Sequence, residues 1–208
     1  MNRITYAIFA TGLLASVVAG GYGWLKSVTW ERQQQAAVAT EIAIAQVSEV
    51  ERAANRGEIT HDQEVVKARA VIESVQYGKD GYLFAYDHGT VMAHGKSPAF
   101  VGKNLIDKHD DEGHYMIRDL HRVADDGTHW TTFGWKNTGE VVERVKVGYA
   151  ANTQGNLGWM VGSGIYIDNI AEDWVSVEEL EFFGLLGLFL LYSPLVFFGG
   201  KSKEKEDI

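Results

Sequence analysis

Residues 77–94 read YGKDGYLFAYDHGTVMAH, two short runs of apolar and aromatic residues on either side of a turn. Tyr82–Tyr86 predicts a strand, Asp87–Gly89 its turn, and Val91–His94 the strand that returns. The stretch therefore predicts an antiparallel hairpin, around which the rest of a sheet has to be assembled.

The chain after the hairpin supplies further elements of this sheet. Residues 95–112 form a long connection. Apolar spacing then predicts a helix over 111–126, closed by Gly127, and three more strands over 129–135, 141–151 and 159–168. Because no connection has to cross over to a parallel neighbour, the pattern predicts an α+β domain with a five-stranded antiparallel sheet.

Two helices are predicted before the hairpin. Residues 27–55 contain no glycine or proline, so they predict a long helix that ends at Gly57. Thr60–Gln63 fits the capping-box pattern that starts a second helix. The apolar positions of that helix are Val65, Ala68, Ile72 and Val75, and Gly78 is expected to follow its end.

Each end of the chain carries an uncharged apolar block, 22 residues over Ile4–Leu25 and 19 residues over Phe182–Gly200. A helix needs about 20 apolar residues to cross the hydrocarbon core, so we predict transmembrane helices within 1–25 and 182–200. A signal peptide is the alternative for the first block, and a buried soluble helix for the second.

The basic flanks predict the orientation of these two spans. Arg3 precedes the first block, and Lys201, Lys203 and Lys205 follow the second. Positive flanks favour the cytoplasm, so residues 26–181 are expected outside the membrane and 201–208 form a charged cytoplasmic tail. The predicted location is a bacterial inner membrane crossed twice, with a periplasmic domain.

Composition excludes several classes of function. The absence of cysteine excludes disulfides and thiolate metal sites. Residues 26–181 hold 15 of the 19 basic and 25 of the 28 acidic residues, a net charge of −10 that opposes binding to nucleic acid. No nucleophile elbow, Walker sequence, dinucleotide fingerprint or His-Glu-x-x-His motif is present, so we expect neither an enzyme nor a cofactor.

Four segments in order resemble the single Cache domain, a PAS-like extracytoplasmic sensor domain of bacterial chemoreceptors and sensor kinases. They are Tyr77–Asp87, Gly89–His94, Val101–Asp107 and Gly158–Asp168. The resemblance covers roughly residues 27–175. It implies a long N-terminal helix, a five-stranded antiparallel sheet and binding of small organic molecules, often short carboxylates such as acetate, propionate, lactate or pyruvate.

The resemblance points to Tyr82, His94, Lys146 and Tyr149 as ligand-binding residues. A carboxylate sensor needs a small, mostly apolar pocket and a cation. Strand alternation places Lys146 and Tyr149 on opposite faces unless a bulge intervenes. Each residue also has a structural alternative: a solvated charge for Lys146, core packing for Tyr149 and a strand-end loop residue for His94.

The helix predicted over 111–126 adds two further ligand-binding candidates, Tyr115 and Arg118. The alternative for Arg118 is a surface ion pair with an acid of its own helix. The acid- and histidine-rich stretch 107–114 has ligand types that suit a divalent ion but lacks zinc or EF-hand spacing, so a solvated loop is expected there and no metal site.

The chain departs from the Cache pattern in two places. Residues 136–140 stand where the family usually has a proline-containing loop, and the chain ends eight residues after Gly200, with no cytoplasmic transmitter. We therefore expect a membrane-anchored sensor for signal transduction or chemotaxis that either acts through a separate partner or is a truncated receptor. An accessory or assembly subunit with a Cache-like scaffold that binds no ligand is the alternative.

The first apolar block also carries a pattern for association. Gly12, Ser16 and Gly20 recur at four-residue spacing, which lets two helix backbones approach closely. A homodimer through this face of the helix is one interpretation, and the alternative is that small residues are simply common in membrane helices.

Overall fold

The computed structural model describes residues 3–137 and 139–167 of the chain. Its contacts define a compact unit of Thr29–Asn169, and Met1–Val28 and Ile170–Ile208 belong to a second unit. The helices are α1 (Arg3–Asn55), α2 (His61–Ser74), the 3-10 turn η1 (Pro98–Phe100) and α3 (Met116–Asp125). The strands are β1 (Gln76–Tyr77), β2 (Gly81–Tyr82), β3 (Phe84–Asp87), β4 (Thr90–His94), β5 (Trp130–Trp135), β6 (Arg144–Asn152) and β7 (Met160–Tyr166).

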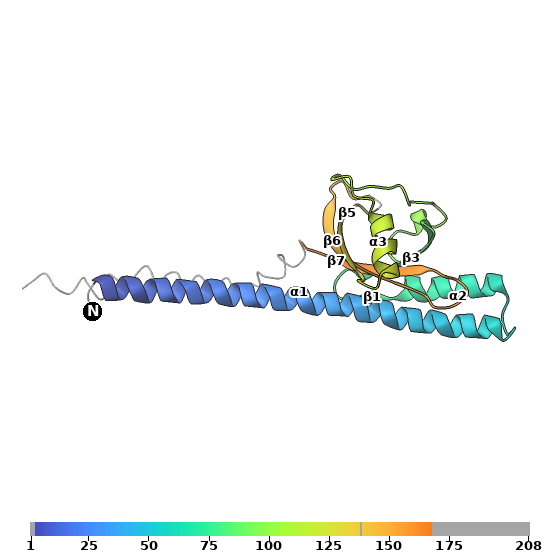
Figure 1. Cartoon of the computed structure of the whole chain (residues 1–208), viewed down its shortest axis with the longest axis horizontal. Coiled ribbons are helices and arrows are strands. Elements are labelled where there is room, and N and C mark those ends of the chain that lie inside the picture. The colour runs from blue at the N-terminus through green and yellow to red at the C-terminus, as the bar shows by residue number, and fades with distance from the viewer. Residues whose placement is uncertain (1–2, 138, 168–208) are drawn as a thin grey trace, which may run out of the picture. The chain divides into compact units, whose positions relative to one another are not determined.

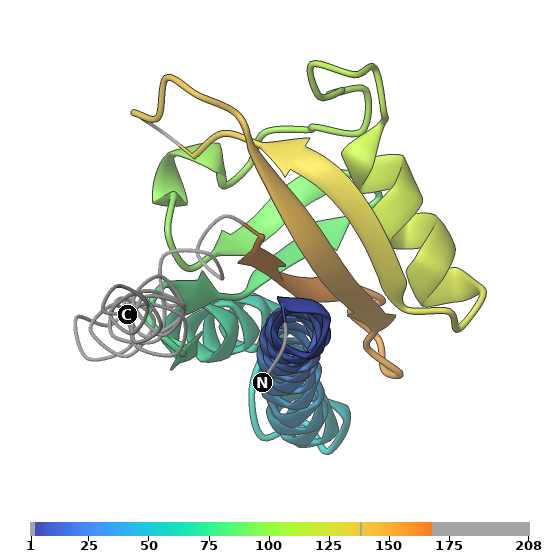
Figure 2. The same cartoon turned by 90° about the vertical axis from the view of Figure 1, so that its left-hand side faces the viewer.

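The compact unit is a sheet with helices on both faces. Its five strands lie in the order β4-β3-β7-β6-β5, and every neighbouring pair is antiparallel. The second half of α1 and the whole of α2 run along one face of the sheet, and α3 covers the other (Figure 1, Figure 2). The predicted α+β fold with a long N-terminal helix and a five-stranded antiparallel sheet is confirmed.

The predicted start of the second helix is also confirmed. Gln63 N donates to Thr60 Oγ1 at 3.3 Å, and Thr60 N donates to Gln63 Oε1 at 2.9 Å. The predicted end is wrong, because α2 stops at Ser74 and Val75 is already extended, well before Gly78. The reason is the short ribbon that follows, in which Gln76 pairs with Tyr82.

Two other elements start later than the sequence predicts. The third helix begins at Met116 rather than Asp111, because the Asp110 carboxylate accepts the backbone N–H groups of Glu112 at 3.1 Å and His114 at 2.8 Å. These bonds fold 110–114 into a turn in which Gly113 has φ +88°.

Strand β6 begins at Arg144 rather than Val141 for a similar reason. Glu140 N donates to Asn137 O at 3.0 Å, and the Glu140 carboxylate accepts from Asn137 N at 2.9 Å. These reciprocal bonds close the connection into a turn, and Val141 and Val142 after it are exposed.

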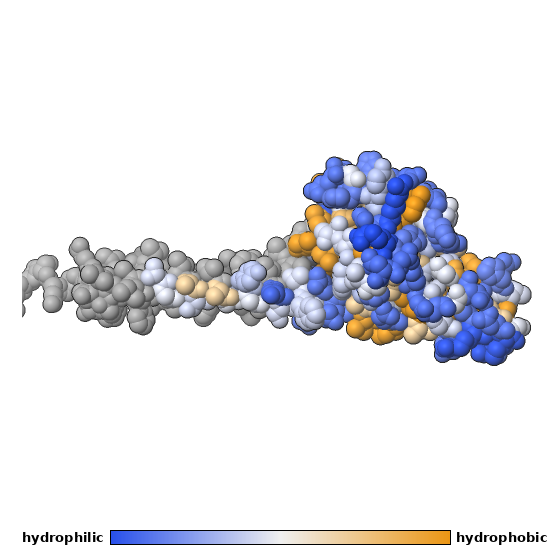
Figure 3. Space-filling view, viewed as in Figure 1, coloured by the Kyte–Doolittle hydropathy of each residue, from blue (hydrophilic) through white to orange (hydrophobic). Residues whose placement is uncertain are grey.

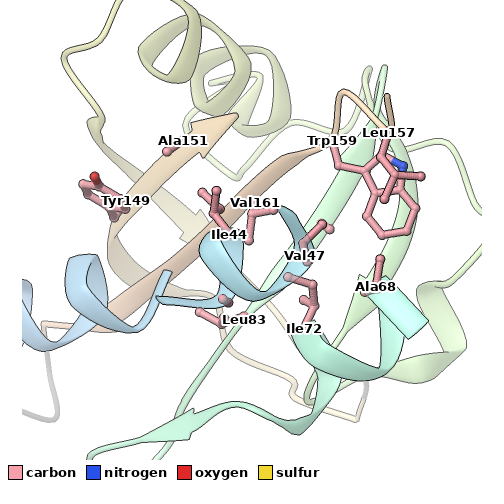
Figure 4. Close-up of a cluster of buried hydrophobic side chains, with 13 residues drawn as sticks. Ile44, Val47, Ala68, Ile72, Leu83, Tyr149, Ala151, Leu157, Trp159 and Val161 are labelled. Carbon is pink, nitrogen blue, oxygen red and sulfur yellow. The ribbon is translucent and has the colours of Figure 1, made fainter. Parts of the chain in front are cut away.

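The core on the α1–α2 side of the sheet is aliphatic with one large indole. Ile44 and Val47 from α1 and Ile72 from α2 pack against strand residues that include Leu83 and Val161 (Figure 4). Trp159 is 1% exposed in the same cluster. A second cluster joins the other face to α3, and its members include Met116, Ile117, Leu120, Phe133 and Tyr86. Because both faces are covered, every residue of β7 is buried.

Buried hydrogen bonds fasten α1 to the central strand. Thr40 Oγ1 donates to Ser163 Oγ at 2.9 Å, and Ser163 Oγ donates to Ala36 O at 3.0 Å. The neighbouring Gly162 faces the other way, where a Cβ would collide with the Phe84 ring. Gly162 therefore leaves room for the Phe84 ring on the α3 side of the sheet. On the other side, Ser163 is the residue of β7 that forms hydrogen bonds with α1.

The predicted membrane spans remain predictions. Within the part of the chain that the structure describes, no helix combines the length and the apolar character needed to cross a membrane. The second predicted span, 182–200, and the tail, 201–208, lie outside the described residues. The face of the compact unit seen in Figure 3 is mostly hydrophilic, with apolar patches between the hydrophilic residues.

Candidate functional site

Six side chains converge on the α3 side of the sheet into a cluster that we call the aromatic box. Its members are Tyr82, Phe84, His94, Trp135, Lys146 and Tyr166, and each is no more than 4% exposed. Strand alternation brings them together, since Tyr82 and Phe84 share one face while Leu83 and Ala85 pack on the other. Lys146 and Tyr166 are direct cross-strand partners in the β6–β7 ladder.

Lys146 places a cation in this apolar setting. It is 1% exposed, and its Nζ donates to Tyr82 Oη at 3.0 Å. The same Nζ lies 4.1 Å from the centroid of the Tyr82 ring and 4.8 Å from that of Tyr166. Burial lowers the pKa of Lys146 to about 7, an effect that Asp80 opposes and Lys96 adds to.

His94 places a hydrogen-bond donor beside this cation. Its Nδ1 accepts the backbone N–H of Ser97 at 3.0 Å and of Lys96 at 3.3 Å, so the ring proton resides on Nε2. Nε2 is buried and has no hydrogen-bond partner among residues 3–137 and 139–167. Burial, and secondarily the charge of Lys146, lower the pKa of His94 to about 3. His94 is therefore a neutral N–H donor without an acceptor, stacked on Tyr82 with ring centroids 5.0 Å apart.

Asn137 holds the rim of the aromatic box in a fixed geometry. Its Oδ1 accepts from Tyr82 Oη at 2.9 Å and from Trp135 Nε1 at 3.1 Å. Its Nδ2 donates to Tyr166 Oη at 2.6 Å. Glu140 in turn accepts from Asn137 Nδ2 at 3.0 Å. Asn137 is 4% exposed, and both its amide oxygen and its amide nitrogen form two hydrogen bonds each. The amide therefore orients three aromatic residues, and its carbonyl oxygen cannot accept a further hydrogen bond.

The free hydrogen-bonding capacity of the box consists of donors. An ammonium has three N–H donors, of which Lys146 uses one on Tyr82, and His94 Nε2–H adds another. The walls are aromatic faces. Such a site suits a small anion with a short apolar part, because the anion accepts from the donors and the rest contacts the rings.

The structure brings together three of the six predicted site residues, namely Tyr82, His94 and Lys146. Tyr149 lies on the opposite face of the sheet, where its Oη donates to Glu41 at 2.6 Å and its ring packs on Trp130 at 4.9 Å between centroids. The register of β6 is continuous from Arg144 to Asn152, so no bulge turns Tyr149 toward Lys146. Tyr149 therefore does not lie with the other three, and a role for it in ligand binding stays a prediction.

Tyr115 and Arg118 also lie away from the box. Both are exposed, the Arg118 guanidinium stands 4.3 Å over the Tyr115 ring, and it forms an ion pair with Asp107. The inward positions of α3 are taken by Ile117 and Leu120, which turns Arg118 outward. The expected surface ion pair exists, but its acid belongs to the preceding loop rather than to the same helix.

Arg118 instead lines an open groove of about 560 Å³ on the outside of α3. The other residues of this groove are Ile106, His121, Arg122, Asp125 and Asp126.

The sequence did not single out Trp135, Asn137 and Tyr166 as site residues. Trp130 and Trp135 of β5 face opposite sides of the sheet, as strand alternation requires for two residues five positions apart. Tyr166 follows from Lys146 once the strand register is known. Asn137 carries no periodic signal, because its position is set by a turn.

The acid- and histidine-rich stretch 107–114 is organised around one buried carboxylate. Asp110 is 4% exposed and, besides the two N–H groups of its own turn, accepts Gly134 N of β5 at 3.0 Å. His114 Nδ1 lies 3.2 Å from the same carboxyl group. The stretch therefore fastens a loop to the edge of the sheet.

The sequence matches a known family over most of the compact unit. The family is described as "Single Cache domain 2", and its sequence model matches residues 28–179. The chain is 32% identical over 143 residues to the methyl-accepting chemotaxis protein CtpM of Pseudomonas aeruginosa, covering 67% of this chain and 24% of that protein. It is 30% identical over 114 residues to the sensor histidine kinase MctS of Rhizobium johnstonii, covering 52% of this chain and 24% of that protein.

Solved structures share the fold. A methyl-accepting chemotaxis protein from Vibrio parahaemolyticus superposes with a TM-score of 0.62 at 24% identity, covering 73% of this chain and 99% of that one. A structure described as the structural basis for carboxylic acid recognition by a Cache chemosensory domain superposes with a TM-score of 0.61 at 17% identity, covering 68% and 97%.

Proposed function

The chain belongs to the single Cache domain 2 family, and from that premise we propose that it is an extracytoplasmic sensor that binds a short organic carboxylate in the aromatic box and passes the signal to a partner. The chain spans about a quarter, 24%, of the length of the chemotaxis protein and of the sensor kinase that it matches. One structural neighbour recognises carboxylic acids, which supports testing the same ligand class here.

The observation that carries the proposal is the buried Lys146. A lysine is almost never fully buried unless it is paired, and Lys146 is 1% exposed with a tyrosine hydroxyl as its hydrogen-bond partner. A ligand carboxylate supplies the missing negative charge. One of its oxygens accepts from Lys146 Nζ and the other from His94 Nε2, while the apolar end of the ligand contacts the rings.

The two faces of the central strands offer a route for the signal. Lys146 lies on one face of β6, while Tyr149 of the same strand donates to Glu41 of α1 on the other face. Ser163 joins the adjacent strand β7 to α1 in the same way. A ligand that binds one arrangement of these strands more tightly shifts the population toward it, and α1 moves with the strands.

The membrane anchor, the partner and the dimer are parts of this proposal. Both termini are cytoplasmic and the sensor domain is periplasmic in this proposal, because both apolar blocks have basic flanks. Cysteines introduced at Asn55 and Ser202 should differ in labelling by an impermeant reagent on intact cells. Labelling at Ser202 but not at Asn55 contradicts this topology.

Dimerisation is assigned to the small-residue face of α1. Ser16 Oγ donates to Gly12 O within the helix at 2.9 Å, so its hydroxyl does not need an acceptor on a partner chain. The small side chains on this face let a second helix approach closely. Replacing Gly12 and Gly20 by leucine should lower cross-linking between two chains in the membrane. Unchanged cross-linking excludes this face.

Thermal-shift and calorimetric titration of the full chain in detergent tests ligand binding. Acetate, propionate, lactate and pyruvate are the probes, and Lys146→Met is the variant. The expected result is a stabilising shift with at least one acid that Lys146→Met loses and Arg118→Gln, a change at an exposed ion pair, keeps. If the unaltered chain binds none of the four acids, the accessory-scaffold alternative is favoured instead.

A further inference from the structure

The aromatic box contains a buried lysine amine that faces no carboxylate partner in the described part of the chain. Lys146 forms no ion pair with any carboxylate of residues 3–137 and 139–167. Glu140, the acid next to the box, directs its carboxylate to Asn137 and to Lys96 at 3.8 Å. Burial of Lys146 without a carboxylate partner disfavours the ammonium and favours the neutral amine.

The charged groups around Lys146 do not outweigh the effect of burial, which lowers its pKa. Asp80 and Glu140 favour its charged form, while Lys96 and Arg144 oppose it, and burial has the largest effect. Other titratable groups beside the site are Tyr82 of β2, His94 of β4, Tyr166 of β7 and Lys108 of the loop before α3.

We propose that the aromatic box takes up a proton together with its ligand: Lys146 is largely a neutral amine in the empty site around neutral pH and above, and a ligand carboxylate binds only when Lys146 is an ammonium. The inference rests on the proposed function and adds its regulation by pH. The site gains one anion and one proton, so the buried charge after binding sums to zero.

Lys146 is the group in the box that can accept this proton. Protonating His94 at Nδ1 would break its bonds from Ser97 N and Lys96 N and would place a second cation beside Lys146. Burial holds the pKa of Tyr82 and of Tyr166 above the usual tyrosine value, so both hydroxyls keep their protons. The lysine amine, by contrast, has its pKa lowered to about 7 in the empty site.

Linkage fixes the expected pH dependence. Affinity for the carboxylate should be constant well below pH 7 and should fall about tenfold per pH unit above it, until the raised pKa of the lysine in the complex is reached. Binding should take up about half a proton per ligand near pH 7 and close to one near pH 8.

Calorimetric titration of the full chain with acetate, propionate, lactate and pyruvate near pH 8 tests the inference. HEPES and Tris differ in ionisation enthalpy, so proton uptake appears as a difference in the apparent heat of binding between the two buffers. The expected result is a difference that corresponds to about one proton taken up per ligand. Binding with equal heats in both buffers overturns the inference and leaves the proposed function standing.

Two variants identify the proton acceptor. Lys146→Arg keeps its charge at every accessible pH, so it should bind without proton uptake and without the loss of affinity above pH 7. Lys67→Arg, an exposed change on α2, should behave like the unaltered chain. If Lys146→Arg does not fold, the two-buffer comparison on the unaltered chain still decides. The absence of binding near pH 6 with all four acids overturns the proposed function and this inference with it.

Discussion

The two faces of the sheet are built from the same strands but have opposite chemistry. On the α1–α2 face the side chains are mostly aliphatic, and the polar groups of the strands are paired, Ser163 with Thr40 and Ala36, and Tyr149 with Glu41. On the α3 face an aromatic cluster encloses the Lys146 amine and the His94 imidazole N–H, and within residues 3–137 and 139–167 neither the amine has a carboxylate partner nor the imidazole N–H an acceptor.

This difference separates packing from binding. A satisfied polar group in a core stabilises the fold, whereas an unsatisfied one lowers stability unless a ligand completes it. Mutations on the α1–α2 face should therefore change the free energy of unfolding and leave ligand affinity in place. Mutations in the aromatic box should lower ligand affinity more than they lower stability.

The largest effect is expected from Trp159→Ala on the α1–α2 face. Trp159 is 1% exposed, and truncating a buried tryptophan costs about 3–5 kcal/mol of stability. Urea denaturation measures the loss, and the fraction that stays folded should bind the carboxylate with unchanged affinity. Trp30→Ala, at an exposed position, is the control. A weaker ligand affinity with normal stability would reverse the assignment of the two faces.

Lys146→Met should have the next largest effect, with opposite signs for binding and folding. Affinity for the carboxylate should fall by about 2–5 kcal/mol, the scale for removing one member of a buried charge pair. Stability of the empty protein should rise, because methionine fills the site without a charge to dehydrate.

The gain in stability from Lys146→Met should depend on pH. The folded-state pKa of Lys146 is lowered to about 7, below its unfolded value, so the unaltered protein is penalised below pH 7 and recovers as pH rises toward about 10.5. Urea denaturation near pH 6 and near pH 9 should show the larger gain at the lower pH. An equal gain at both pH values argues against a buried titrating lysine.

His94→Phe keeps an aromatic ring but removes the Nε2–H donor. A hydrogen bond to a charged group contributes about 1.5–3 kcal/mol, so affinity should fall by that amount as measured by calorimetry. A smaller loss of stability should accompany it, since Ser97 N loses its acceptor. Unchanged affinity would mean that the ligand does not reach this nitrogen.

Ser163→Ala should have the smallest effect. It removes the bonds that join β7 to α1, at about 1 kcal/mol of stability, and should leave the intrinsic carboxylate affinity unchanged. Its informative readout is the coupling between the ligand and α1, for example cross-linking of α1 with and without acetate. If ligand-dependent cross-linking survives intact, the signal takes another route.

Sequence patterns that depend on neighbouring residues predicted parts of this site correctly, whereas contacts between distant residues were not predicted. Strand alternation is local, so it placed Lys146 opposite to Tyr149, as the structure has them. The resemblance to the family pointed to Tyr149 and Lys146 as residues of one ligand site, although alternation placed them on opposite faces of the sheet. The structure agrees with the alternation.

The sequence did not predict where the loops end, because side-chain hydrogen bonds set the geometry of these loops. Asp110 delays the start of α3, and the reciprocal bonds of Asn137 and Glu140 delay the start of β6. Asn137 also orients Tyr82, Trp135 and Tyr166. The spacing of residues in the sequence does not predict these contacts.

A crystal structure of the protein with the tightest-binding of the four acids tests the central claim most directly. We predict the ligand inside the aromatic box, with one carboxylate oxygen within hydrogen-bond distance of Lys146 Nζ and the other within the same distance of His94 Nε2. A ligand found in the open groove beside Arg118, or in the box with its carboxylate turned away from Lys146, would contradict the account.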